Sequence, residues 1–109
     1  MSTDLDSRKY LPLTETTYYI MLSIVEPLHG YAVMQKVEQI SRGTVKLGPG
    51  TLYGAISMLE QGELAAKVSE ENRRKTYVLT AKGKKVLSSQ IERLDIMTQN
   101  GQEVLARLR

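Results

Sequence analysis

The stretch from Leu47 to Glu60, LGPGTLYGAISMLE, decides how the chain folds. Its apolar residues Leu52, Ile56 and Leu59 stand at positions i, i+4 and i+7, which predicts a helix with one buried face. Pro49 suits the first turn of such a helix, because the backbone N–H that proline lacks would have no partner there. A helix covering a core would normally carry Glu and Lys on its outer face, and this one does not.

The outer face of the predicted helix is instead small or hydroxylated: Gly50, Thr51, Tyr53, Gly54 and Ser57. Gly48 and Gly50 let the backbone approach a large partner and leave amide groups free at the positive end of the helix dipole, where a phosphate binds well. Thr51 could reach a phosphate or a thymine methyl group, and Tyr53 a phosphate. In the alternative interpretation, GPG is a tight turn and Tyr53 packs on a neighbouring helix.

Two further helices are predicted before this segment. Thr14 has the character of an N-cap, and the helix after it should end near Glu26, followed by a turn at PLHG. The next helix should run over residues 31–41 and end before Gly43. The predicted buried residues of the two helices are Tyr18, Met21, Leu22 and Val25, then Val33, Met34, Val37 and Ile40.

After the quoted segment and Gly62, the periodicity changes to that of strands. Residues 64–69 and 76–80 are short and rich in Val, Thr, Leu and Tyr, which predicts a β-hairpin around the tip EENRRK. Arg73, Arg74 and Lys75 form a basic run there, and Lys67 lies on the preceding strand. A hairpin tip can enter a minor groove, where narrow A·T tracts attract arginine. The alternative is a solvated basic turn. Further phosphate candidates are Lys46, just before the third helix, and Lys82, Lys84 and Lys85 at the start of the last helix.

A long helix is predicted after Thr80, and the pair Asn100–Gly101 is expected to kink or break it. Its stripe recurs every three or four residues and comprises Leu87, Ile91, Leu94, Thr98, Gly101, Leu105 and Leu108. Burying one such apolar side chain is worth about 1.5–3 kcal/mol, so the stripe predicts a homodimer interface. Alternatively the helix folds back on its own domain.

The composition excludes several classes of function. The chain of 109 residues carries a net charge of +3, no Cys and a single His. Disulfides are therefore excluded, and no metal site, nucleophile–base pair or nucleotide-binding loop can be assembled, which argues against an enzyme or a bound cofactor. His29 is interpreted as a turn or packing residue. No signal peptide or apolar run of about 20 residues appears, so we expect a cytoplasmic protein without membrane contact.

The order helix, helix, helix, hairpin, long helix predicts a winged helix-turn-helix, a mainly α fold with a small β-hairpin. We expect an N-terminal polar segment over 1–12, a DNA-binding domain over 13–80 and a dimerisation helix over 81–109.

Three stretches resemble the short PadR-like transcriptional regulators: LTETTYYIMLSIVEPLHGYAVMQKVEQIS, VKLGPGTLYGAISMLE and ENRRKTYVLTAKGKKVL. The resemblance covers residues 13–88. It implies a dimeric winged-helix repressor whose last helix forms the dimer, and in many members a response to small aromatic or hydrophobic compounds. The match puts Thr51 and Tyr53 on the recognition helix and Arg73, Arg74 and Lys75 on the wing. Met58 stands where relatives often carry Arg or Lys, which would remove one phosphate contact.

The sequence therefore predicts a dimer that binds a palindromic duplex operator, with its recognition helices about 34 Å apart. The alternative is a winged helix whose third helix binds another protein. A hydrophobic or aromatic effector is expected in a cleft between two C-terminal helices, lined by Tyr18, Tyr19, Ile91, Leu94 and Met97. Here the alternative is a dry, packed dimer core.

Overall fold

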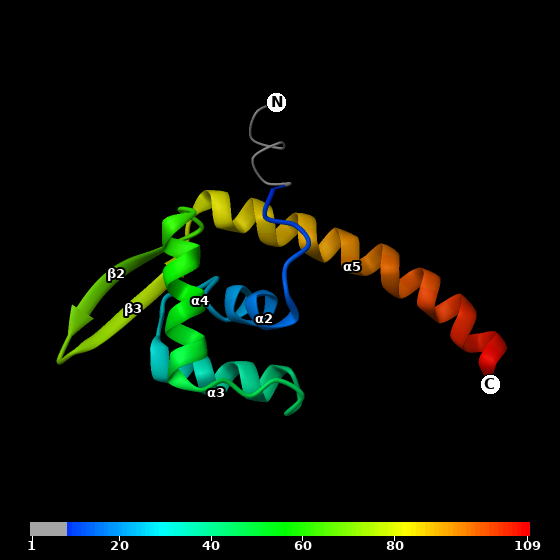
Figure 1. The fold of residues 1–109 in the computed structure, drawn as a ribbon, viewed down its shortest axis with the longest axis horizontal. Helices are drawn as coiled ribbons and strands as arrows, with labels where there is room; N and C mark the ends of the chain where they lie inside the picture. Colours follow the sequence, from blue (N-terminus) through cyan, green and yellow to red (C-terminus); the bar gives the residue numbers. More distant parts are fainter. Residues whose placement is uncertain (1–8) are drawn as a thin grey trace.

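The computed structural model describes residues 9–109, and Figure 1 shows a helical body with a hairpin on one side and a long helix on the other. The elements are α2 (Glu15–Ser23), β1 (Leu28–His29), α3 (Gly30–Ile40), α4 (Pro49–Gln61), β2 (Ala65–Glu71), β3 (Arg74–Leu79) and α5 (Ala81–Leu108). The strands form one antiparallel sheet in the order β1-β3-β2, which confirms the predicted winged-helix class. Most of the predicted N-terminal segment, residues 1–8, lies outside the described residues. Within residues 9–109, no helix combines the length and the apolar composition that a membrane crossing requires.

The core lies where α2, α3, α4, the sheet and the start of α5 meet. Leu52, Ile56 and Leu59 are buried there, which confirms the predicted inner face of α4. For α2 the predicted face was wrong in part. Ile20 and Ile24 are fully buried with Met21, whereas Tyr18, Leu22 and Val25 are only half-buried.

Helix α2 begins as predicted, because the Thr14 hydroxyl accepts a hydrogen bond from the Thr17 N–H at 3.1 Å. Its predicted end near Glu26 was wrong, since the helix stops at Ser23. The predicted PLHG turn is also corrected: Leu28 and His29 form strand β1 and pair with Tyr77 and Thr76 of β3.

The turn between α3 and α4 is fixed by a buried serine. The Ser41 hydroxyl accepts from the Val45 N–H at 3.0 Å and donates to the Val45 carbonyl at 3.2 Å. Gly43 has φ +79°, and its N–H donates to the Glu38 carbonyl at 2.8 Å, as expected of a helix-ending glycine. This compact turn sets the direction in which α4 leaves α3.

The wing is longer, and its turn tighter, than predicted. Strands β2 and β3 pair as far as Glu71 and Arg74, which leaves only Asn72 and Arg73 in the turn. Both turn residues have positive φ, at 51° and 68°. The pairing register shifts between Lys67 and Ser69, a β-bulge that leaves Val68 exposed.

Helix α5 is continuous for 28 residues, so of the kink or break predicted at Asn100–Gly101 the break was wrong. The Thr80 hydroxyl caps the helix by accepting from the Gly83 N–H at 3.0 Å. Val86 and Leu87 pack into the core, and the helix then projects away from the body (Figure 1). Leu87 is therefore corrected from the predicted dimer stripe to the core of its own chain.

Candidate nucleic-acid interface

The outward face of α4 is as bare as its sequence suggests. Gly50, Thr51, Tyr53, Gly54 and Ser57 are all exposed, on the side opposite the three buried apolar residues. A Cβ atom added at Gly48, Gly50 or Gly54 would meet no other atom within 4 Å. The middle of this face is thus backbone that a large partner can approach directly.

The N-terminus of α4 lacks a side-chain cap. Gly48 is the N-cap and makes no side-chain hydrogen bond, and Pro49 follows it at the first helical position. The N–H groups of the first turn have no partner within a helix, and here they lie at the positive end of its dipole. Lys46 is exposed in the loop just before them. This end of α4 therefore favours an anion.

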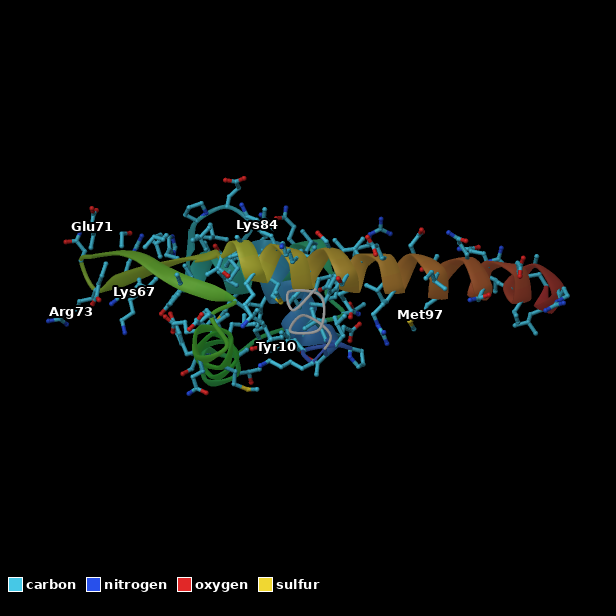
Figure 2. The ribbon with its side chains drawn as sticks, turned by 90° about the horizontal axis from the view of Figure 1, so that it is seen from above. Tyr10, Lys67, Glu71, Arg73, Lys84 and Met97 are labelled. Carbon is cyan, nitrogen blue, oxygen red and sulfur yellow. The ribbon has the colours of Figure 1, made fainter. Side chains whose placement is uncertain are left out.

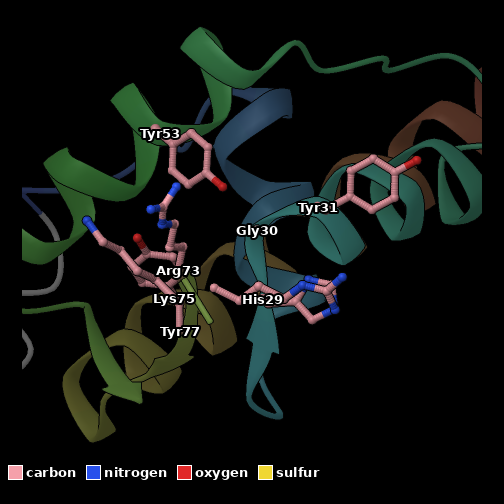
Figure 3. A pocket seen from close by; sticks show the side chains of 8 residues that line it. His29, Gly30, Tyr31, Tyr53, Arg73, Lys75 and Tyr77 are labelled. Carbon is pink, nitrogen blue, oxygen red and sulfur yellow. The ribbon is translucent and has the colours of Figure 1, made fainter. Parts of the chain in front are cut away.

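One flank of α4 borders a basic hollow of ≈ 340 Å³, lined by His29, Gly30, Tyr31, Tyr53, Arg73, Arg74, Lys75 and Tyr77. Figure 3 shows that these side chains come from β1, the start of α3, α4 and the wing. Three of them are cationic and none is acidic. The hollow thus brings the predicted wing cations and Tyr53 together.

The alternative interpretation, in which Tyr53 packs on a neighbouring helix, holds in part, and its contact with a phosphate stays a prediction. A Cβ at Gly30 would collide with the Tyr53 hydroxyl, so the ring lies against the start of α3. Yet 44% of the side chain remains exposed, at the edge of the basic hollow. A side chain at position 30 would therefore have to displace the Tyr53 ring.

The basic hollow contains residues that sequence reasoning missed. Tyr77 is only 4% exposed, and burial first, then Glu60 and Tyr53, raise the pKa of its phenol. Its position as an inward-facing tyrosine of a strand was the signal available. His29 has a structural role within the hollow, since its Nδ1 accepts from the Ala32 N–H at 3.4 Å and caps α3.

The wing cations differ in their surroundings. Only Arg73 lies in the turn, whereas Arg74 and Lys75 lie in β3, opposite Glu71 and Glu70. In Figure 2, Lys67 and Arg73 extend to the side on which α4 lies, and Glu71 extends to the other side. The predicted basic run is therefore spread along the wing.

Lys67 is already paired within the chain. Residues three apart on a regular strand face opposite sides, but the bulge at Val68 brings Lys67 and Glu70 to one side. Their side chains form an ion pair at 3.0 Å, which raises the pKa of Lys67 and lowers that of Glu70. Lys67 thus carries less free charge toward a partner than Arg73.

A second concavity of ≈ 400 Å³ lies between α2 and α5, and is lined by Pro12, Leu13, Glu15, Tyr18, Tyr19, Gln90, Arg93, Leu94 and Met97. It brings together four of the five residues predicted for a ligand cleft, and Ile91 is the one it omits. The rings of Tyr18 and Tyr19 meet edge to face, with their centroids 5.7 Å apart.

The remaining stripe of α5 is uncovered in the single chain. Ile91, Thr98, Leu105 and Leu108 are exposed and Leu94 is half-buried. Gln90, just before the stripe, is buried and accepts from the Leu13 N–H at 3.1 Å through its side-chain oxygen.

Residues 20–89, from α2 through the wing to the first turns of α5, match the model of the transcriptional regulator PadR-like family. The chain belongs to this family. The matched residues of this PadR-like protein include all of α4 and the whole basic hollow.

Two curated relatives overlap the PadR-like chain in part. A 37.1 kDa protein of transposon Tn4556 from Streptomyces fradiae is 43% identical over 61 residues, 56% of this chain and 17% of that protein. The transcriptional regulator YqjI of Escherichia coli strain K12 is 25% identical over 71 residues, 65% of this chain and 34% of that protein. The chain thus spans about a third or less of these relatives' length.

Solved structures share the fold of the PadR-like chain. A PadR-like transcription factor from Bacteroides fragilis superposes with a TM-score of 0.67 at 24% identity, covering 95% of this chain and 99% of that one. A PadR-family regulator from Clostridium difficile R20291 gives 0.67 at 23% identity, covering 82% and 97%. RosR of H. salinarum, in a complex with the partner called S4, gives 0.68 at 20% identity, covering 95% and 97%.

Proposed function

We propose that the protein is a dimeric, sequence-specific DNA-binding repressor of transcription that works in the cytoplasm. The observation that carries the proposal is the bare outer face of α4 beside the basic hollow. Membership of a family of transcriptional regulators supports it. A protein-binding face would be apolar and aromatic at its centre, whereas the centre of this one is Gly50, Gly54 and Ser57.

Each part of the face has a counterpart on duplex DNA. The major groove, about 12 Å wide, admits an α-helix, and the glycines of α4 let its backbone approach closely. The basic hollow lies beside α4, where a groove wall would place a phosphate. Arg73 at the wing turn then extends toward the neighbouring minor groove.

The salt dependence of binding tests this arrangement. Replacing Arg73 with Ala should weaken binding to duplex DNA and reduce the slope of log K against log salt by about 0.9 for one lost phosphate contact. Lys84 was also a phosphate candidate from the sequence, but it lies on the side of α5 that points away from α4 (Figure 2). Lys84→Ala is therefore the matched control, because it removes the same charge outside the proposed interface. An equal slope change in both variants would show that only net charge matters and would contradict the proposed interface.

The exposed stripe of α5 supports the dimer. From Ile91 onward its residues follow the alternating three- and four-residue spacing of a two-helix seam. Twofold pairing would present two α4 helices to one face of DNA and so match an inverted repeat.

Analytical ultracentrifugation tests the dimer. Leu105→Asp should shift the chain toward the monomer, whereas Ala106→Asp, one residue away and off the stripe, should leave the dimer intact. A wild-type chain that stays monomeric at micromolar concentrations would refute the dimer.

The concavity between α2 and α5 supports an effector site for a small hydrophobic or aromatic compound. Such a compound would release the operator by binding the DNA-free conformation more tightly. In a thermal-shift screen, phenolic and cationic aromatic compounds should raise the melting temperature of the wild type. The rise should be as large in the control variant Met58→Ala, and smaller in Met97→Ala, because only Met97 lines the concavity. Uniform absence of stabilisation would exclude the site.

A further inference from the structure

Helix α4 lacks the side chains that usually read guanine and adenine. Arg and Lys make paired hydrogen bonds to guanine, and Asn and Gln to adenine. The sequence of α4, PGTLYGAISMLEQ, contains no Arg, Lys, His or Asn, and its one Gln is Gln61 at the last position. Gln61 lies eleven residues after Gly50, about 16 Å along the axis, so the rest of α4 carries no side chain of this kind.

The flank of α4 opposite the basic hollow is apolar. Thr51, Ala55 and Met58 stand at i, i+4 and i+7 along it, and Met58 is 72% exposed. They border an apolar hollow of ≈ 510 Å³, lined also by Tyr10, Pro12, Leu13, Thr14, Thr16, Thr17, Gly50, Gly54, Leu59 and Leu64. None of these residues is charged.

The chemistry of this flank matches one feature of the major groove. Among the four bases only thymine presents an apolar group there, its C5 methyl, and it is read by contact with methyl and other apolar side chains. The methyl group of Thr51 and the thioether end of Met58 are side chains of that kind, and both lie next to the bare centre of α4.

We infer that α4 selects its operator by thymine methyl groups seated against Thr51 and Met58 at the edge of the apolar hollow. The inference rests on the proposed function and specifies it. On one flank of α4 the basic hollow binds the DNA backbone and does not distinguish one base from another. The apolar flank supplies the base contacts. Met58, which offers no charge to a phosphate, thereby becomes a specificity-determining residue.

The experiment begins by selecting duplexes from a random library with the full chain. Each thymidine of the enriched sequence is then replaced in turn by deoxyuridine, which removes only the methyl group. Within each half-site, at least one replacement should weaken wild-type binding about fourfold, which corresponds to about 0.8 kcal/mol for one buried methyl. Replacements outside the half-sites should change nothing.

The variant Met58→Ala separates contact from DNA shape. At the position that Met58 covers, this variant should bind the thymidine and deoxyuridine duplexes equally, whereas an effect through DNA shape would persist in it. Thr51→Ser, which removes a methyl and keeps the hydroxyl, should act likewise at a second position. Both residues are exposed, and unchanged melting curves will show that the variants fold.

The outcomes distinguish this inference from the proposed function. The inference is overturned if the chain selects one sequence tightly and no deoxyuridine replacement in it weakens binding. It is also overturned if binding to a half-site depends on guanine N7 and is lost when 7-deazaguanine replaces guanine. Failure to enrich any sequence, with no retention on duplex DNA, overturns the proposed function itself.

Discussion

The body of the molecule and the distal half of α5 are stabilised in different ways. Every buried residue of the described chain lies at or before Gln90. From Ile91 to Leu108 the helix buries nothing fully, although it exposes Ile96, Met97, Val104 and Leu108. The body thus has a core of its own, whereas none of the other described residues covers the apolar residues of distal α5, which we propose pair in a dimer. Stability of the first part should not depend on protein concentration, and order in the second part should.

The largest contrast is expected from truncating one apolar side chain in each region. Ile56→Ala removes a fully buried side chain of α4 and should lower the free energy of unfolding by about 2–5 kcal/mol. Leu108→Ala should change it by less than about 0.5 kcal/mol in dilute solution. Urea denaturation at two protein concentrations measures both. Equal effects would mean that the two regions are not distinct.

The same substitution at two glycines of α5 should act with opposite sign. Gly83 lies against the backbone of Leu64, the residue just before β2, and a Cβ there would collide with the Leu64 carbonyl oxygen. Gly83→Ala should therefore destabilise the body by about 1–3 kcal/mol, since well-packed backbone must move apart. Thermal unfolding followed by circular dichroism gives the value, and a variant as stable as the wild type would contradict this close packing.

At Gly101 nothing lies within 4 Å of an added Cβ. Gly101→Ala should stabilise the distal helix by about 0.5–1 kcal/mol, because alanine loses less backbone entropy in a helix. Slower amide hydrogen exchange over residues 97–105 is the expected result. Faster exchange would instead place a backbone contact at Gly101, such as a close approach of the partner helix.

The smallest effect on stability is expected in the wing. Like distal α5, the wing is exposed, since the residues of β2 beyond Ala66 are all exposed. Lys67→Ala should raise the pKa of Glu70 toward its usual value, because the hydrogen bond from Lys67 is the main cause of its lowering. The pair supports the wing at neutral pH, and this support is lost as the pH falls through the lowered pKa of Glu70. NMR titration of the Glu70 carboxyl measures it, and Lys75→Ala should give the smaller rise.

The sequence predicted elements whose signals are local. The stripe of Leu52, Ile56 and Leu59, the Thr14 and Thr80 caps and the ending at Gly62 all lie within one helix or next to it. Strand β1 was missed because two residues show no periodicity and pair only with distant β3. The hairpin turn was predicted too long because the strand ends are charged and exposed, so hydrophobic alternation disappears there.

The sequence predicted which side chains the candidate site would contain, but not how they pack around the basic hollow. Thr51, Tyr53 and the wing cations follow from helix and hairpin patterns, whereas the approach of Tyr53 to Gly30 joins residues far apart in sequence. The break at Asn100–Gly101 was wrongly predicted because one exposed glycine costs about 1 kcal/mol, too little to interrupt a helix of 28 residues.

The wing turn has a consequence for engineering. Its two residues, Asn72 and Arg73, both adopt the left-handed backbone that Asn-Gly fills most readily in two-residue hairpins. A chain selected for rigidity alone would therefore acquire glycine at position 73, and its hairpin would become harder to unfold while it lost the guanidinium that we propose contacts DNA. In screens for heat-resistant variants of this protein, the guanidinium at the wing turn should therefore be among the first groups to be replaced.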